Sequence, residues 1–182
     1  SAEMSFGNPQ NYSSFLYIFV GTFLGGGLVL NNQLVNGKTG NAGAVGSLPF
    51  YNGSTQSQLI TQSSLYLLER KLNDAGHNGQ HIYESPSHWS CDTRSIEDWL
   101  SETARGLAFA TQCAMSLLDL DGVIIDGAIP DDVKNALVAH TQSAMKTLDM
   151  RGLAQVHISE GLVGRKAQSI GSANLALQAN YY

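Results

Sequence analysis

The 182-residue sequence has few charged side chains and no cluster of one sign. Charged residues make up 14% of the chain, the formal net charge is −5, and the ten lysines and arginines are scattered. Proteins that hold nucleic acid by its phosphates present a basic patch, so this composition argues against direct nucleic-acid binding. No apolar run reaches the roughly 20 residues that cross a bilayer, and no signal-peptide pattern is present. We expect no membrane partner and a cytoplasmic location.

Cysteine is nearly absent, and the few potential metal ligands are poorly placed. Cys91 and Cys113 are too few for a disulfide framework, which fits a reducing compartment. His77, His81 and His88 share a segment with Cys91, and a His-x-x-x-His pair on a helix can bind a metal. The glycines, proline and serines around this pair predict a loop instead. We therefore predict no metal site there.

Glycine is abundant, and its most prominent cluster follows the apolar run Phe15–Val20. This run is rich in aromatic and β-branched residues and predicts a buried strand. Four glycines between residues 21 and 27 then predict a loop whose backbone N–H groups are not covered by side chains. Two further strands are predicted at 28–30 and 33–35, with a tight turn at 31–32 between them.

This glycine cluster has two interpretations. It can form tight turns in a β-meander, or it can form a loop whose N–H groups bind an anion or a sugar. The pattern matches neither common phosphate fingerprint, because no Lys-Ser/Thr pair follows and a strand comes next. A second series of glycines occurs at every third position, at 37, 40, 43 and 46. The residue types alone leave both interpretations open.

The rest of the chain predicts alternating helices and strands. Apolar residues at helical spacing predict a helix from Ser57 to Asn73. A longer, alanine-rich helix is predicted up to Leu118, beginning near Ser95 with Asp98 in a capping arrangement. The remaining predictions are strands at 122–125 and 154–158, helices at about 130–149 and at 167–177, loops at 48–55 and 77–93, and turns at 126–130 and 161–164. Strand–helix alternation after an antiparallel hairpin sheet predicts an α/β architecture.

The chain resembles the ROK family of bacterial sugar kinases and sugar-responsive repressors. That family carries a strand, a Gly-Thr-Gly-x-Gly-x-Gly hairpin, an Asn-Gly turn and a Gly-x-x-Gly-x-x-Gly-Glu-x-Gly-His segment. The corresponding segments here are VGTFLGGG at 20–27 and GNAGAVGS at 40–47. Residues 117–128 and 167–175 resemble the family's Leu-Leu-Asp-Pro-x-x-Ile-Val-Ile-Gly-Gly region and its closing Ile-Gly-Ala-Ala helix.

This resemblance covers only the C-terminal half of a family member. It implies one lobe of the actin-like, ribonuclease-H-like ATPase fold, an antiparallel hairpin sheet extended by short parallel strands with flanking helices. Residues 15–182 would be the lobe for effector binding and oligomerisation, and residues 1–14 a disordered end, linker or tag. The first lobe and an N-terminal helix-turn-helix domain would lie outside this chain.

By the same resemblance, the nucleotide-phosphate loop is present in a degenerate form. Its retained positions are Gly21, Thr22, Gly25, Gly27 and Gly127. Phe23 replaces the second hairpin glycine and would put a ring where phosphates need bare backbone. Asp126 replaces the first adenosine-side glycine, and its carboxylate would repel phosphates. We therefore do not expect an ATP–magnesium cofactor, and we predict no catalytic residue in this lobe.

The sugar and zinc positions of the family have also changed. Ala44 stands at the family's sugar-contacting glutamate and Ser47 at its zinc-binding histidine. No cysteine, histidine or glutamate lies between residues 47 and 68, and the family's three zinc cysteines would fall at Ser57, Leu59 and Ser64, so no zinc is expected. The remaining sugar-site candidates are Asn41, Gly43, Ala44, Ser47 and Tyr66. Their alternative role is to stabilise turns.

Three functions are compatible with these observations. The first is the effector-binding and oligomerising lobe of a ROK-type transcriptional regulator without kinase activity. Its partners would be a sugar or sugar phosphate, operator DNA through the absent N-terminal domain, and further copies of the chain in a homodimer or larger oligomer. The alternative is a lobe of a divergent ATP-dependent sugar kinase. The third is a scaffold that binds no small molecule.

Overall fold

A five-stranded mixed sheet organises the protein. The computed structural model describes residues 10–84, 88–90 and 92–164; the predicted helix at 167–177 lies outside these residues. The strands are β1 (Phe15–Val20), β2 (Leu24–Leu30), β3 (Gln33–Val35), β6 (Gly122–Gly127) and β7 (His157–Glu160), in the order β3-β2-β1-β6-β7. The first three are antiparallel, while β6 runs parallel to β1 and β7 parallel to β6. The predicted α/β fold is therefore confirmed.

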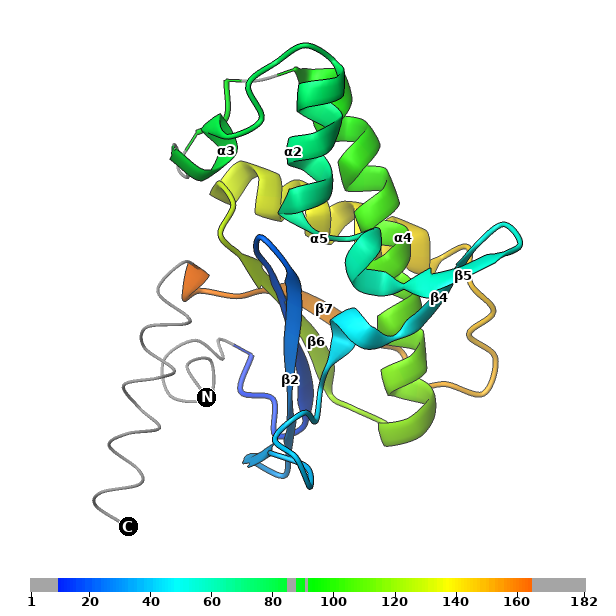
Figure 1. Ribbon diagram of the computed structural model, residues 1–182. Helices are drawn as coiled ribbons and strands as arrows, with labels where there is room; N and C mark the ends of the chain where they lie inside the picture. Colours follow the sequence, from blue (N-terminus) through cyan, green and yellow to red (C-terminus); the bar gives the residue numbers. More distant parts are fainter. Residues whose placement is uncertain (1–9, 85–87, 91, 165–182) are drawn as a thin grey trace.

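The main helices gather on one side of this sheet, where α2 runs beside α4 and α5 crosses them (Figure 1). The helices are α2 (Leu65–Asp74), α3 (His81–Glu84), α4 (Thr93–Leu118) and α5 (Asp131–Met145). A separate hairpin of β4 (Pro49–Asn52) and β5 (Thr55–Gln58) lies between two 3₁₀ turns, η1 (Val45–Ser47) and η2 (Leu59–Thr61). Within the described residues, no helix is both long and apolar enough to cross a membrane.

The alternation of side chains along β1 builds a core on each face of the sheet. Leu16, Ile18 and Val20 belong to the large core shared with α4, in which Trp99 and Leu107 are also fully buried. Successive side chains of a strand point to opposite faces, so the residues between them face the other way. The smaller core on that face consists of Phe15, Val29 and Ile124, with Tyr12, Tyr17 and Leu34 packed against it. The apolar run therefore forms a strand buried on both faces, as predicted.

Local hydrogen bonds shift the predicted starts of α2 and α4. Ser57 pairs with Phe50 in the β4–β5 hairpin, so the predicted loop at 48–55 and the predicted helix start at Ser57 are wrong. The helix begins at Leu65, where the Ser64 hydroxyl accepts the N–H of Leu67 at 3.4 Å. The predicted cap of α4 is also wrong, because Asp92 caps that helix through the Ser95 N–H and hydroxyl.

Other boundaries differ by a few residues. β6 continues through Asp126 and Gly127, which were predicted as a turn; α5 ends at Met145 and β7 starts at His157. At the N-terminal side, the Asp121 carboxylate accepts hydrogen bonds from the N–H groups of Ser13 and Ser14 and from the Ser13 hydroxyl. Ser13 and Ser14 therefore belong to the folded lobe, because these contacts attach them to the loop ahead of β6.

Candidate functional site

The carboxyl ends of three parallel strands meet at one edge of the sheet. Val20 is paired with Gly127, and Ile125 with Glu160, so β1, β6 and β7 end side by side. In open α/β sheets, ligands commonly bind in the crevice at this edge. Three residues of the predicted phosphate loop, Gly21, Thr22 and Gly127, are brought together here.

The other two, Gly25 and Gly27, lie inside β2 rather than in a loop. They pair with Phe19 and Tyr17 of β1, which contradicts the prediction of a loop with uncovered N–H groups. Gly26 explains why glycine is needed in this strand. A Cβ there would lie 2.6 Å from the Gly43 carbonyl oxygen, so the glycines permit close packing of a neighbouring segment.

The turn between β1 and β2 uses its backbone groups internally. The N–H of Gly21 donates to the carbonyl of Phe23 at 3.1 Å. The carbonyls of Gly21 and Thr22 accept the N–H groups of Leu65 and Tyr66 at 2.9 and 3.4 Å. The turn therefore caps helix α2, and the first N–H groups of that helix are not available to an anion.

Phe23 stands at the tip of this turn with 65% of its surface exposed. The ring does not fill a pocket. The effect of this ring on phosphate binding stays a prediction.

Tyr83 joins the short helix α3 to α2 and the turn. Its hydroxyl donates to the Glu69 carboxylate at 3.1 Å and also interacts with Thr22. Burial and the neighbouring Glu69 charge raise the pKa of Tyr83 to about 12.

The stability of the protein should therefore fall as the pH rises above 10. The unfolded chain releases the Tyr83 proton near pH 10, whereas the folded chain keeps it until about pH 12. Between these values the unfolded state binds fewer protons, so each rise in pH favours unfolding. Urea unfolding across this range should show a steeper loss of stability for the wild type than for Tyr83→Phe. Parallel profiles for the two proteins would contradict this account.

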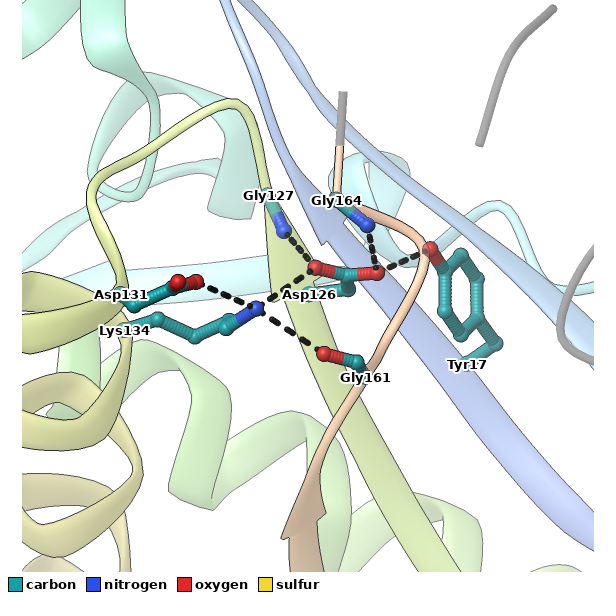
Figure 2. A network of polar contacts seen from close by, with 7 residues as sticks. All are labelled: Tyr17, Asp126, Gly127, Asp131, Lys134, Gly161 and Gly164. Atoms are coloured by element: carbon teal, nitrogen blue, oxygen red, sulfur yellow. Dashed lines mark hydrogen bonds and ion pairs between the residues drawn. The ribbon is translucent and has the colours of Figure 1, made fainter. Parts of the chain in front are cut away.

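Asp126 forms the most highly connected polar group of this edge (Figure 2). Its carboxylate is fully buried and accepts the N–H of Gly127 at 2.8 Å, the N–H of Gly164 at 2.7 Å and the hydroxyl of Tyr17 at 3.1 Å. The ammonium of Lys134 lies 3.5 Å from the same carboxylate. The charge of Asp126 is thus held inside the protein, near the carboxyl end of β6.

Lys134 is committed to the same cluster. Its ammonium donates to the carbonyl of Gly161 at 2.9 Å and lies 3.2 Å from the exposed Asp131 carboxylate, as well as near Asp126. The sequence did not predict Lys134, Tyr17, Gly161 or Gly164 as members of this site. The available signal was a lysine among the buried positions of α5 and an aspartate in an otherwise apolar strand, because buried charges require partners.

The predicted sugar-site residues lie along β2 rather than around one point. Gly43 packs against Gly27 inside β2, whereas the Tyr66 N–H bonds to Thr22 in the turn before that strand. The side chains of Asn41, Ala44, Ser47 and Tyr66 are all exposed.

Gly43 and Ala44 also line an apolar groove of about 230 Å³ between β2, η1 and the end of α4. The groove is lined mostly by leucine, alanine and valine side chains, with Cys113 beside them. Sugar hydroxyls need polar partners, so this groove is a poor match for a sugar. The sugar contacts of Gly43 and Ala44 stay a prediction.

Substitution of Gly43 by alanine should destabilise the protein strongly. Gly43 has φ +77°, and a Cβ there would lie 2.8 Å from the Cα of Gly27. Gly40 is the matched control, because it has φ +79° but no atom within 4 Å of such a Cβ. Gly40→Ala should cost about 1–2 kcal/mol from the backbone alone, and Gly43→Ala about 2 kcal/mol more from the added clash. If denaturant unfolding gave equal losses of stability for the two variants, Gly43 would not be packed tightly against Gly27.

The positions aligned with the family's zinc cysteines have structural roles. Ser57 lies in β5, Leu59 is buried in η2, and Ser64 caps α2. Over residues 10–84, 88–90 and 92–164, no three histidine, cysteine, aspartate or glutamate side chains are grouped to hold a metal. His81 instead pairs with Glu84 within α3 at 3.1 Å.

Comparisons by sequence and by fold both find proteins similar to this chain. The sequence model described as "ROK family" matches residues 1–58. A ROK family glucokinase from Streptomyces griseus, solved with glucose and AMPPNP, superposes with a TM-score of 0.77 at 22% identity, over 97% of this chain and 64% of that chain. A ROK family transcriptional regulator, a homologue of the E. coli MLC protein, superposes with a TM-score of 0.73 at 20% identity, over 94% and 48% of the respective chains.

A curated relative, the uncharacterized protein y4fQ of Sinorhizobium fredii, is 24% identical over 159 residues, which are 86% of this chain and 38% of that protein. The chain thus spans less than two thirds of the length of each of these relatives. The resemblance to the ROK family and the actin-like fold that it implies are confirmed.

Proposed function

We propose that this ROK-type chain is the effector-binding and oligomerising lobe of a transcriptional regulator without kinase activity. The buried carboxylate of Asp126 carries the proposal. It lies at the carboxyl edge of the sheet, where a nucleotide-binding lobe of this type needs room and positive potential for phosphates. A lobe that lacks these features still provides a scaffold for sugar-dependent changes in conformation.

The electrostatics of the edge support this proposal. Phosphoryl transfer depends on cations and oriented donors that stabilise the charge on the phosphates. Here the ammonium of Lys134 and the N–H of Gly127 are already directed at Asp126. A phosphate group would therefore have to compete with an internal carboxylate for the same donors. The exposed ring of Phe23 stands at the turn beside them.

The alternative is a lobe of a divergent sugar kinase. Gly21, Thr22 and Gly127 lie together at the sheet edge, and the fold also superposes on a glucokinase solved with glucose and AMPPNP. Both kinds of protein share the fold, so the fold alone does not separate them. The difference lies in whether the full-length protein binds ATP.

The partners follow from the regulator proposal. The effector would be a sugar or sugar phosphate, bound with the help of Asn41, Ser47 and Tyr66. Operator DNA would bind to a separate N-terminal domain, since the described lobe belongs to a chain with net charge −5. We propose a cytoplasmic homodimer or larger oligomer, with no zinc and no ATP–magnesium cofactor.

Thermal unfolding of the full-length protein tests this proposal. The ligands are a panel of sugars and sugar phosphates, with ATP–magnesium as a separate arm. A ligand at about 100 times its dissociation constant stabilises the folded state by roughly 2.7 kcal/mol, which shifts the unfolding midpoint measurably. We expect a shift with a sugar and none with ATP–magnesium; a shift with ATP–magnesium would favour the kinase.

Two tyrosine variants provide a matched control for the sugar site. Tyr66 and Tyr51 are both exposed, at 50% and 62%, but Tyr51 lies on the β4–β5 hairpin. Tyr66→Phe should reduce the sugar-induced shift, and Tyr51→Phe should leave it unchanged. Stabilisation by no member of the panel would favour the scaffold.

A further inference from the structure

We propose that Asp126 is a built-in anion: its carboxylate occupies a carboxylate-binding cradle that fastens residues 161–164 across the carboxyl edge of the sheet. This inference concerns the lobe itself and does not depend on the regulator assignment. It identifies a binding site for a small carboxylate, which the chain fills with its own side chain.

The donors around Asp126 have the composition of an anion site. Two are backbone N–H groups, of Gly127 and Gly164, one is the hydroxyl of Tyr17, and one is the ammonium of Lys134 (Figure 2). They come from β6, the segment after β7, β1 and α5, so four parts of the chain converge on one carboxylate. Donors directed at a common point bind a carboxylate well, because both of its oxygens accept charge-assisted hydrogen bonds.

The cradle is also closed around its occupant. Asp126 is fully buried, and a Cβ on Gly161 would lie 2.5 Å from the Asp126 Cβ. That added Cβ would also lie 2.6 Å from the Asp126 Oδ2. Gly161 therefore packs tightly against the Asp126 side chain, and the cradle fits a carboxylate more closely than a larger phosphate group.

The contacts of the cradle hold the segment that follows β7. The N–H of Gly161 donates to the Ile125 carbonyl at 2.8 Å, and the Gly161 carbonyl accepts Lys134. In the network of Figure 2, Gly164 takes part through its N–H, which donates to Asp126. Loss of the carboxylate should therefore release Gly164 and remove the acceptor that all four donors share.

Chemical rescue tests the cradle with two variants of the full chain. Asp126→Ala removes a carboxylate and leaves a space that matches formate. Asp126→Gly removes one more carbon and matches acetate. Each variant should be stabilised saturably by its matched anion, beyond the effect of chloride at the same ionic strength, and by phosphate no more than by chloride. The wild type should show no such effect, because its cradle is already occupied.

Asp121→Ala is the matched control. Asp121 also accepts three hydrogen bonds, from Ser13 and Ser14, but it does so in an exposed position. Water can replace its carboxylate there, so formate should not stabilise this variant beyond chloride. Equal formate effects at the two sites would overturn the proposal.

The proposal can still be tested if a variant does not fold in chloride. Circular dichroism of that variant should then recover the helical signal in its matched carboxylate. Failure of both anions to stabilise or refold the Asp126 variants would overturn the proposal. Rescue by phosphate as strong as by the matched carboxylate would also overturn it, because a closed, carboxylate-sized cradle excludes that result.

Discussion

Replacement of Lys134 by methionine should lower the free energy of unfolding by about 3–5 kcal/mol, because it leaves a buried carboxylate without its counter-charge. The Lys134 side chain is 8% exposed and the Asp126 side chain 0%. Methionine preserves most of the apolar length of lysine, so loss of packing contributes little. Guanidinium unfolding followed by circular dichroism measures the change.

A second, exposed lysine provides the control for this prediction. Lys71 pairs with Glu102 at 3.1 Å, but both side chains are about one-third exposed. Lys71→Met should therefore cost no more than about 1 kcal/mol. The double variant Asp126→Asn with Lys134→Met should recover part of the loss, since it removes both buried charges. Similar costs for Lys134→Met and Lys71→Met would contradict a buried ion pair.

Truncation of Trp99 to alanine should cost about 3–5 kcal/mol, the range for large aromatic side chains in cores. Trp99 is fully buried in α4, and its indole N–H donates to the Ser64 carbonyl at 3.0 Å. Its ring meets that of Trp89 edge to face, with centroids 6.1 Å apart. Because Ser64 caps α2, this loss should also loosen the helix that holds the β1–β2 turn.

Leu117 is the control for Trp99, since it lies in the same helix with 82% of its surface exposed. Leu117→Ala should change the free energy of unfolding by less than about 0.5 kcal/mol. Chemical denaturation followed by far-ultraviolet circular dichroism compares the two variants without relying on tryptophan fluorescence. A small effect of Trp99→Ala would mean that α4 is not anchored through this side chain.

The sequence predicted the strands that carry a clear local signal. The apolar run Phe15–Val20 forms a strand at the predicted residues, and the turn at Asn31–Asn32 adopts positive φ at both positions. The glycines of β2 were assigned to a loop because glycine has little preference for strands. Glycine occurs in this strand because of tertiary packing: Gly43 and Val45 lie so close that no side chain fits at Gly26.

The site was predicted in part for similar reasons. Gly21, Thr22 and Gly127 were identified, and the parallel pairing of β1 with β6 brings them together. Asp126 was identified as a change that opposes phosphate binding, but its partners were missed. Lys134 follows it by eight residues and Gly164 by 38, and only the folded chain brings their polar atoms to one carboxylate.

Transfer of the γ-phosphate of ATP to a sugar is the most direct test of the central claim that Asp126 closes the phosphate edge. The full-length protein is incubated with ATP–magnesium and a panel of hexoses, and sugar phosphate is quantified against reactions without sugar. The regulator proposal predicts no product above that background. Sugar-dependent phosphate transfer by the purified protein would contradict the account, and would show that phosphates bind despite the buried carboxylate.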